Sequence, residues 1–315
     1  MKKFLLSATM LVFLVSCNNE ENAVSTETSK AAERGCASHT VLENQLRANP
    51  ELAIKMNEIE AFTERAMQEG RLVNGKIEIP VVVNVLYRTT AENISLSQIQ
   101  SQIDVLNKDF NGTNTDFNKV PALFSGVKAT VGISFVLDAV YRKATTKTSW
   151  GTSDAMKKTT YGGMAPTSPT TKLNLWVCTI GGGILGYAQF PGGSSSTDGV
   201  AIDSKYFGTT GSATYPFNLG RTATHEVGHW MNLRHIWGDA TCGSDLVSDT
   251  PSHNDANYGV PAYPHYSTCS GTPVEMTMNY MDYTDDRGMY MFSNGQKTRM
   301  NAVFLSGGSR ASFRL

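Results

Sequence analysis

The chain has 315 residues and 40% of them are hydrophobic, which is enough to bury a core and excludes disorder along the whole length. Lys and Arg number 27 against 28 Asp and Glu, leaving a net charge of −1. This balance excludes the basic surface typical of proteins that bind nucleic acid or anionic membranes.

The N-terminus has the pattern of a secretory signal. Two lysines precede an apolar run from Phe4 to Val15, which is too short to span a bilayer. The run ends in Leu-Val-Ser-Cys, which resembles a bacterial lipobox and predicts residues 1–17 as a lipoprotein signal with lipidation of Cys17. An ordinary signal peptide with a chance cysteine is the alternative. The polar residues 18–33 predict a flexible tether, so we expect an exported protein, anchored by lipid at a bacterial outer membrane or cell surface, or released after processing.

Two short amphipathic helices are predicted between Val41 and Met67. Apolar residues recur there at helical spacing among charged ones, and Asn49-Pro50 interrupts the pattern. Gly70, Asn74 and Gly75 then mark a boundary.

From Lys76 onward the pattern becomes that of strands and helices in alternation. The β-branched run Ile77–Tyr87 predicts a buried strand. Ser95 or Ser97 can cap a helix that follows. Further strands are predicted at Ile133–Val140 and Leu173–Ile180.

One cluster of histidines has the spacing of a metal site. His225-Glu226-Val227-Gly228-His229 is an HExxH motif, in which the two His project from one helix face, one turn apart, and can reach one metal. Glu226 is rotated by about 100° from His225 and can hold a water beside the metal. Alone, this motif is only suggestive.

A third histidine strengthens the interpretation. On a continuous helix His235 would lie about 15 Å beyond His225, too far to share a metal. The helix must therefore stop so that the chain turns back, which normally needs Gly, or sometimes Asn, in the left-handed conformation. Asn232 stands where this turn is needed. The sequence thus predicts one catalytic zinc ion on His225, His229 and His235.

The string from His225 to His235 resembles the metzincin signature HExxHxxGxxH, with Asn232 where most metzincins have Gly. The segment Asn279–Tyr283 resembles the Met-containing turn of the same enzymes. Within the metzincins the chain resembles the pappalysin family, in particular its bacterial ulilysin- and cytophagalysin-like members, over residues 36–305. The segments that carry this likeness are residues 185–191, 224–238, 245–251 and 278–286.

The resemblance implies a fold and an activity. The fold class would be α/β (α+β), a metzincin-type zincin, with residues 76–315 as the peptidase domain. It would have a twisted mixed β-sheet, a backing helix and an active-site helix in an upper subdomain, and an irregular lower subdomain with the Met-turn. The activity would be that of a monomeric secreted zinc endopeptidase acting on proteins or peptides.

Roles for the site residues follow from this chemistry and from the resemblance. Three imidazoles leave a zinc position open for water, and Glu226 can act as general base and then protonate the leaving amine. By resemblance, Met281 is a hydrophobic floor and Tyr283 lies on or near zinc and donates a hydrogen bond in the transition state; a core tyrosine is the alternative. The residues that resemble the substrate-binding edge strand are Gly186, Tyr187, Ala188 and Gln189.

Two cysteines are predicted to pair. Cys242 and Cys269 lie in the loop-rich region after the zinc motif, where an oxidising compartment favours a disulfide, and the relatives have a bridge with such placement. Cys178 lies in a predicted strand and is most simply a buried thiol.

The remaining cysteine precedes the predicted strands. A thiolate is a strong zinc ligand, so Cys36 could fill the open position, and the pappalysin relatives are zymogens with such a cysteine switch. We therefore expect residues 34–75 to be an inhibitory pro-segment that is removed near Arg71 or Lys76. A Cys36–Cys178 disulfide or an idle thiol are the alternatives.

Acidic residues crowd the loop after His235, and the relatives bind calcium in this region. Oxygen ligands at such density suit calcium, so we expect a structural Ca²⁺ on Asp245, Asp249 and Thr250. Asp239 and Asp255 belong to the same crowd, and a solvated acidic loop is the alternative.

Two other classes of function fit the sequence less well. A non-catalytic binding protein on a metzincin scaffold would lack Glu226 or a histidine, and all are present. A zinc deaminase or deacetylase uses other ligand sets. Some ulilysin-like relatives prefer Arg just after the scissile bond and use an acidic group beyond the Met-turn, where this chain has Asp285-Asp286-Arg287-Gly288. Arg287 could neutralise that pocket, so the sequence leaves an Arg preference open here.

Overall fold

The computed structural model describes residues 33–69 and 77–313 of the chain. The predicted signal with Cys17, the tether up to residue 32 and both predicted cleavage positions, Arg71 and Lys76, lie outside the described residues. Within the two described stretches, no helix is both long and apolar enough to cross a membrane.

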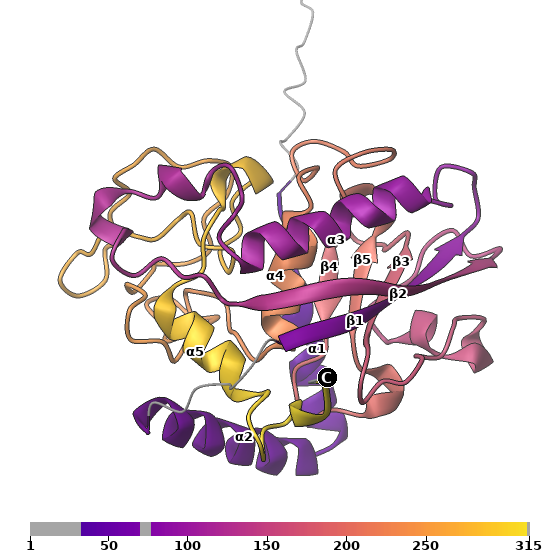
Figure 1. The fold of residues 1–315 in the computed structure, drawn as a ribbon, viewed down its shortest axis with the longest axis horizontal. Coiled ribbons are helices and arrows are strands. Elements are labelled where there is room, and N and C mark those ends of the chain that lie inside the picture. The colour runs from indigo at the N-terminus through magenta and orange to yellow at the C-terminus, as the bar shows by residue number, and fades with distance from the viewer. Residues whose placement is uncertain (1–32, 70–76, 314–315) are drawn as a thin grey trace, which may run out of the picture. The chain divides into compact units, whose positions relative to one another are not determined.

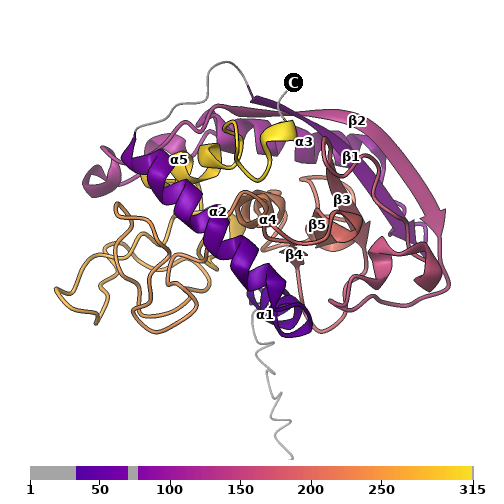
Figure 2. The same cartoon turned by 90° about the horizontal axis from the view of Figure 1, so that it is seen from below.

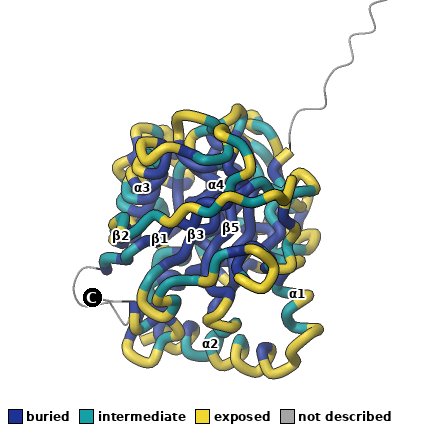
Figure 3. The backbone as a smooth tube through the Cα atoms, turned by 90° about the vertical axis from the view of Figure 1, so that its right-hand side faces the viewer, coloured by how far each residue is buried: buried dark blue, intermediate teal, exposed yellow. Residues whose placement is uncertain are grey.

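A five-stranded sheet forms the centre of the fold (Figure 1). Its strands are β1 (Ile77–Tyr87), β2 (Ile133–Ala144), β3 (Leu173–Cys178), β4 (Gly186–Ala188) and β5 (Val200–Asp203), in the order β2-β1-β3-β5-β4. All neighbours pair in parallel except β4, which runs antiparallel to β5 at one edge. The inner strands β1 and β3 are buried along nearly their whole length (Figure 3), as expected where both faces of a parallel sheet are covered.

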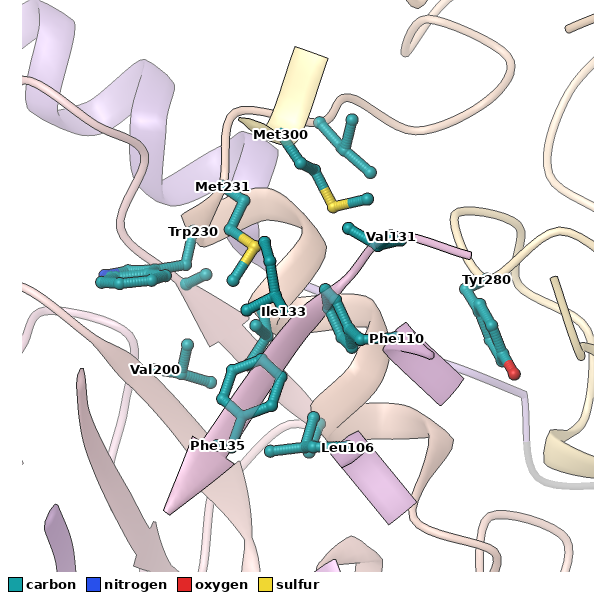
Figure 4. Packing of buried hydrophobic residues seen from close by; sticks show 14 of the residues in the cluster. Leu106, Phe110, Val131, Ile133, Phe135, Val200, Trp230, Met231, Tyr280 and Met300 are labelled. Carbon is teal, nitrogen blue, oxygen red and sulfur yellow. The ribbon is translucent and has the colours of Figure 1, made fainter. Parts of the chain in front are cut away.

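Two helices cover one face of the sheet. Helix α3 (Leu96–Phe110) packs against β2, and α4 (Arg221–Trp230) packs against β4, β5 and α3. Ser95 caps α3 by accepting a hydrogen bond from the Gln98 amide at 3.1 Å. Figure 4 shows the core beneath these helices, where Phe110 lies against the edge of the Phe135 ring. This packing holds α4 firmly behind the edge strand β4.

The chain after α4 is mostly irregular until α5 (Asn294–Ala302). Ser293 and Gln296 form a capping box at the start of α5. The fold class predicted from the resemblance is therefore confirmed: a mixed twisted sheet with a backing helix and an active-site helix is followed by an irregular region that contains Met281.

Two helices precede the sheet, as the pattern predicted. They are α1 (Ser38–Ala48) and α2 (Glu51–Gln68), separated at Asn49-Pro50. Seen from below (Figure 2), both lie in front of α4; α1 contacts β4, whereas α2 packs along α5. We call residues 33–69 the N-terminal segment. It covers the edge of the sheet on which substrate binding is predicted.

The other predicted elements agree with the structure apart from their ends. The strand predicted at 133–140 continues to Ala144, and the strand predicted at 173–180 ends at Cys178. The helix expected after Ser95 or Ser97 begins at Leu96.

Candidate active site

The helix α4 carries the first part of the metal motif, and a sharp turn returns the third histidine to it. Helix α4 ends at Trp230, and Asn232 has a φ of 72°, in the left-handed region. The Asn232 amide donates to the His229 carbonyl at 2.9 Å, and the Leu233 amide donates to the Gly228 carbonyl at 3.0 Å. The predicted turn at Asn232 is therefore confirmed, and it is what returns His235 to the end of α4.

Gly228 explains how Met281 comes so close to the helix. A Cβ atom at this position would lie 2.6 Å from the Met281 sulfur, so only glycine leaves room. Met281 is fully buried, beneath the histidine-bearing turn of α4. This is the place expected of a hydrophobic floor.

The three imidazoles converge through their Nε2 atoms. Nε2 of His229 lies 3.2 Å from that of His225 and 3.1 Å from that of His235. Each Nδ1 is engaged elsewhere: it donates to the Tyr280 carbonyl at 2.7 Å in His225 and to the Leu233 carbonyl at 2.8 Å in His229. In His235 it pairs with the Asp239 carboxylate.

This tautomer pattern fits a zinc ion. Because Nδ1 carries the proton in each neutral ring, three Nε2 lone pairs face one another with no proton between them. Burial holds the pKa of His225 well below its ordinary value and lowers that of His229 to about 3, so these two rings are neutral and their Nε2 atoms carry no proton. A bound cation with nitrogen ligands satisfies all three lone pairs at once.

Glu226 lies beside the histidines and is buried. Its Oε2 accepts a hydrogen bond from the Ser38 hydroxyl at 2.7 Å and faces the Cys36 sulfur at 3.4 Å. Burial raises the pKa of Glu226 to about 7. The pKa of Cys36 is also raised, first by burial and then by the charge of Glu226.

Cys36 joins the histidine cluster from the N-terminal segment. Its sulfur and the ligating atoms of the three histidines all lie within 4.8 Å of one another. Among the residues that the structure describes, this is the one group of three or more His, Cys, Asp or Glu side chains arranged to hold a metal ion.

The N-terminal segment also occupies the edge of β4. Cys36 pairs in parallel with Gly186, the Ala37 amide donates to the Gly186 carbonyl at 3.1 Å, and the Leu185 amide donates to the Gly35 carbonyl at 2.7 Å. The Ala188 amide donates to the Ser38 hydroxyl at 2.8 Å. Residues 35–38 thus use the backbone groups that an added strand would use.

The side chains of the predicted substrate-binding strand serve the fold instead. The Tyr187 hydroxyl donates to Asp154 at 3.0 Å, and the Gln189 amide donates to the Ser194 carbonyl at 2.9 Å. Both residues are buried. Of the four predicted residues, Gly186 and Ala188 offer backbone groups on the edge, whereas Tyr187 and Gln189 hold the strand in place.

Tyr283 faces the same centre from the opposite side. Its hydroxyl donates to the Cys36 carbonyl at 3.1 Å, and its ring contacts those of His235 and Trp237 edge to face, with centroids 4.9 and 4.7 Å apart. Tyr283 is therefore part of the wall of the site, and its ring also packs against the main hydrophobic core.

A buried ion pair next to the site was not anticipated from the sequence. Arg34 donates to Asp286 at 2.6 Å, to the Thr284 carbonyl at 3.2 Å and to the Thr222 hydroxyl at 3.2 Å. Its guanidinium lies 4.9 Å from the centroid of the Phe217 ring. No spacing rule connects Arg34 to Asp286, 252 residues away, so no sequence signal could have found this pair.

The structure corrects the argument about Arg287. Its side chain is 60% exposed and lies 3.9 Å from Asp285, whereas Asp286 pairs with Arg34. Arg287 is thus paired with the neighbouring carboxylate and not with the buried Asp286, and the specificity of the pocket stays a prediction.

A second buried arginine ties the N-terminal segment to the turn after α4. Arg299 of α5 donates through Nε to the Asn232 carbonyl at 2.8 Å and pairs through its guanidinium with Glu60 of α2. Nearby, Ala66 of α2 packs against Ala302 and Leu305.

The acidic residues of the loop after His235 have different hydrogen-bond partners. Asp239 pairs with His235 and also lies 3.2 Å from His39 of the N-terminal segment. Neither Asp245 nor Asp249, the two predicted calcium carboxylates, belongs to a group of three or more potential metal ligands among the described residues. Asp245 accepts from the Thr250 hydroxyl at 2.9 Å, whereas Asp249 accepts from Ser293 and from the Gly295 amide at the start of α5. The calcium site stays a prediction.

Two predictions about the cysteines are confirmed: the Cys242–Cys269 disulfide and the buried thiol of Cys178. Cys242 and Cys269 form a disulfide. Cys36 and Cys178 are both free thiols, and Cys178 is buried within β3, so the alternative of a Cys36–Cys178 bridge is not what the structure has.

Comparison with known proteins places the chain among metallopeptidases. The family model described as pregnancy-associated plasma protein-A matches residues 176–305. An extracellular metalloprotease of Pyricularia oryzae is 32% identical over 85% of this chain and 88% of its own length, and one of Colletotrichum graminicola is 31% identical over 93% and 97%.

Solved structures agree. Mirolysin in complex with a compound is 41% identical, with a TM-score of 0.74 over 77% of this chain and 97% of that one. A mutant of promirolysin from Tannerella forsythia is 38% identical, with a TM-score of 0.81 over 89% of this chain and 97% of that one. With the metal-binding geometry described above, these likenesses show that the chain belongs to the pappalysin family of metzincin metallopeptidases.

Proposed function

We propose that this protein is a secreted zinc endopeptidase that hydrolyses peptide bonds with Glu226 as general base, and that the N-terminal segment keeps it latent. The observation that carries the catalytic part is the convergence of three unprotonated Nε2 atoms beside a buried carboxylate. A scaffold used only for binding has no need of that carboxylate.

Zinc held by His225, His229 and His235 would supply Lewis-acid activation of a water molecule and of the peptide carbonyl. Glu226, whose pKa burial raises to about 7, is suited to take the proton of the attacking water and to deliver it to the leaving amine. Tyr283 donates a hydrogen bond to the Cys36 carbonyl here, and the same hydroxyl would donate to the substrate carbonyl as charge develops on its oxygen.

The latency proposal rests on three contacts of the N-terminal segment. Cys36 lies at the histidine cluster, Ser38 holds the Glu226 carboxylate, and residues 35–38 cover the β4 edge. Promirolysin covers 89% of this chain against 77% for mirolysin, which supports a pro-segment in the corresponding region. Substrate cannot reach Glu226 or β4 until this segment leaves.

The pocket that holds Arg34 supports a preference for substrates with a basic side chain after the scissile bond. Asp286 is fully buried at its base and pairs with the guanidinium of Arg34, so the segment presents to the enzyme the side chain that a substrate would bring. Removing Arg34 with the segment leaves this carboxylate ready for another cation.

Two further parts of the proposal lie away from the active site. Calcium would bind near Asp245, a buried carboxylate whose pKa burial raises to about 7 and which accepts from Thr250. Lipidation of Cys17 would hold the protein at the cell envelope. Incorporation of a labelled fatty acid into the full chain but not into Cys17→Ser tests the anchor.

The decisive experiment uses the full chain activated by limited proteolysis and assayed on a denatured protein with and without a zinc chelator. Activity should disappear on chelation, return with zinc, and fall by about 10²–10⁴-fold in Glu226→Gln. The control Asp104→Asn, on the exposed face of α3, should remain active. A Glu226→Gln protein that cleaves as fast as the wild type would refute the role of Glu226.

Latency is tested on the uncut chain. Cys36→Ala should hydrolyse a short peptide while the wild type remains inactive, because the thiol no longer occupies the histidine cluster. Cys178→Ala, which removes the other free thiol, is the matched control and should stay latent.

A further inference from the structure

The two loops beside the Asp286 pocket are fixed to the pocket itself. The Asp286 amide donates to the Pro216 carbonyl at 3.3 Å, and the Asp285 amide donates to the Gly259 carbonyl at 2.7 Å. The Leu219 amide also donates to the Asp286 carboxylate, at 2.8 Å. Side chains on these loops therefore stand at fixed places around the mouth of the pocket.

Four apolar side chains on these loops are exposed. Tyr215 is 63% exposed, Tyr258 and Val260 are each 46% exposed, and Leu219 is 39% exposed. We call these four residues the aromatic rim. Exposed apolar groups gathered around a polar pocket are typical of a surface that is covered when a ligand binds.

The path of the N-terminal segment shows what crosses the aromatic rim. Cys36 lies at the histidine cluster and Arg34 lies in the pocket, so the chain leads away from the catalytic centre as it passes from Cys36 to Arg34. The Tyr258 ring lies 5.9 Å from that of Tyr283, whose hydroxyl donates to the Cys36 carbonyl. Tyr258 therefore stands beside the stretch of the segment that runs between the histidine cluster and the pocket.

The charges at the mouth of the pocket compensate one another. Arg287 lies 3.9 Å from Asp285, and its guanidinium lies 5.8 Å from the centroid of the Tyr215 ring. This arginine is already paired and set over an aromatic ring, so it offers little to an anionic side chain, and the nearby Asp255 carries a further negative charge that acts on Tyr258. The chemistry left at the rim is that of aromatic and aliphatic surface.

We propose that the aromatic rim is a substrate subsite for apolar or aromatic side chains in the one or two positions that follow the basic residue held by Asp286. This inference rests on the proposed peptidase function and deepens it. The occupant is the substrate segment on the leaving-amine side of the scissile bond, because the rim surrounds the pocket that Arg34 occupies and reaches the catalytic wall where the Tyr258 ring lies 5.9 Å from that of Tyr283.

The test uses the activated full chain and peptides that carry Arg after the scissile bond, with Phe, Leu, Gly or Asp in the next two positions. We expect kcat/KM to be about tenfold higher for Phe or Leu than for Gly, which corresponds to burial of one apolar side chain. In Tyr258→Ala and Tyr215→Ala this preference should fall to about twofold, through KM and with little change in kcat. Tyr141→Ala, an equally exposed tyrosine on β2 at the far edge of the sheet, should keep the full preference.

The possible results distinguish failure of the proposed subsite from failure of the proposed peptidase function. A wild-type enzyme that cleaves all four peptides equally well, or two rim variants that keep the tenfold preference, would overturn the subsite while leaving the peptidase intact. A wild-type enzyme that cleaves none of the peptides, nor any denatured protein, would instead overturn the proposed function. Equal melting temperatures of the variants show that the fold is unchanged.

Discussion

The two ends of the N-terminal segment are attached to the rest of the protein by different physical means. Residues 34–38 make polar contacts with groups that carry chemistry: Asp286, Glu226 and the histidine cluster. Helix α2 makes helix packing and one ion pair with α5, away from those groups. Under the proposed latency the two regions have different roles. Residues 34–38 would occupy the active site, and α2 would hold the segment on the rest of the protein.

The largest effect is expected from Arg34→Ala. Removing one partner of a buried ion pair leaves an uncompensated charge, here on Asp286, at a cost of about 3–5 kcal/mol. The uncut full chain should therefore gain activity on a short peptide by on the order of 100-fold. Mass spectrometry confirms that the chain is still uncut.

Arg34→Lys serves as the control, because it keeps the charge and should restore most of the latency. If the uncut Arg34→Ala chain stayed as inactive as the wild type, latency would not depend on the pairing of Arg34 with Asp286.

A smaller effect, on the rate at which the cleaved segment dissociates, is expected from Glu60→Gln. Arg299 is buried and would lose its counter-charge, but Glu60 is partly exposed and water can replace it in part. After proteolysis between residues 69 and 77, the segment should dissociate about tenfold faster, seen as a faster rise of activity. The final activity should equal that of the wild type.

Glu64→Gln changes an exposed glutamate of the same helix and should leave the dissociation rate unchanged. A lower final activity in Glu60→Gln would show that α2 also shapes the site, which would break the division between the two regions.

The size of the Glu60→Gln effect should depend on pH. Burial raises the pKa of Asp245 to about 7, and the charge of Arg299 acts on this carboxylate. Below pH 7 Asp245 is protonated and Glu60 is the main counter-charge of Arg299, whereas above pH 7 the ionised Asp245 supplies a second one. In calcium-free buffer the variant's acceleration should be about twofold greater at pH 6 than at pH 8. Asp245→Asn should remove this difference, and an acceleration that grows with pH would contradict the assignment.

The smallest effect concerns Asn232. Its left-handed conformation suits glycine better, and its side-chain nitrogen Nδ2 is buried with no hydrogen-bond partner among the described residues. Asn232→Gly should raise the melting temperature by about 1–2 °C, since glycine's greater chain entropy offsets part of the gain. Asn232→Ala should lower it. Because Arg299 binds the backbone carbonyl of residue 232, dissociation of the segment should be the same in Asn232→Gly as in the wild type.

Local patterns in the sequence predicted much of the fold and the centre of the site. The spacing of His225, Glu226, His229 and His235 requires a broken helix, and the left-handed turn at Asn232 is found where that reasoning put it. Helices α1 and α2 and strand β1 follow from periodicity alone. The disulfide followed from compartment and placement.

The remaining features depend on contacts between residues far apart in the chain. Arg34 and Ser38 look like ordinary polar residues of a loop until the fold sets them against Asp286 and Glu226. Asp239 was counted among possible calcium ligands because composition cannot show which carboxylate meets His235. The partner of Arg287 could not be read from the sequence for the same reason, since adjacency does not reveal that it pairs with Asp285 while Asp286 pairs with Arg34.

Arg299 couples two equilibria: docking of the N-terminal segment and formation of the turn that positions His235. One guanidinium contacts both Glu60 and the carbonyl of the residue whose turn returns His235. Whatever steadies that turn favours docking of α2, and docking of α2 favours the turn to the same degree, because such coupling is reciprocal. If the segment keeps the enzyme latent as proposed, the same coupling would make docking of the segment favour metal binding, and metal binding would favour docking.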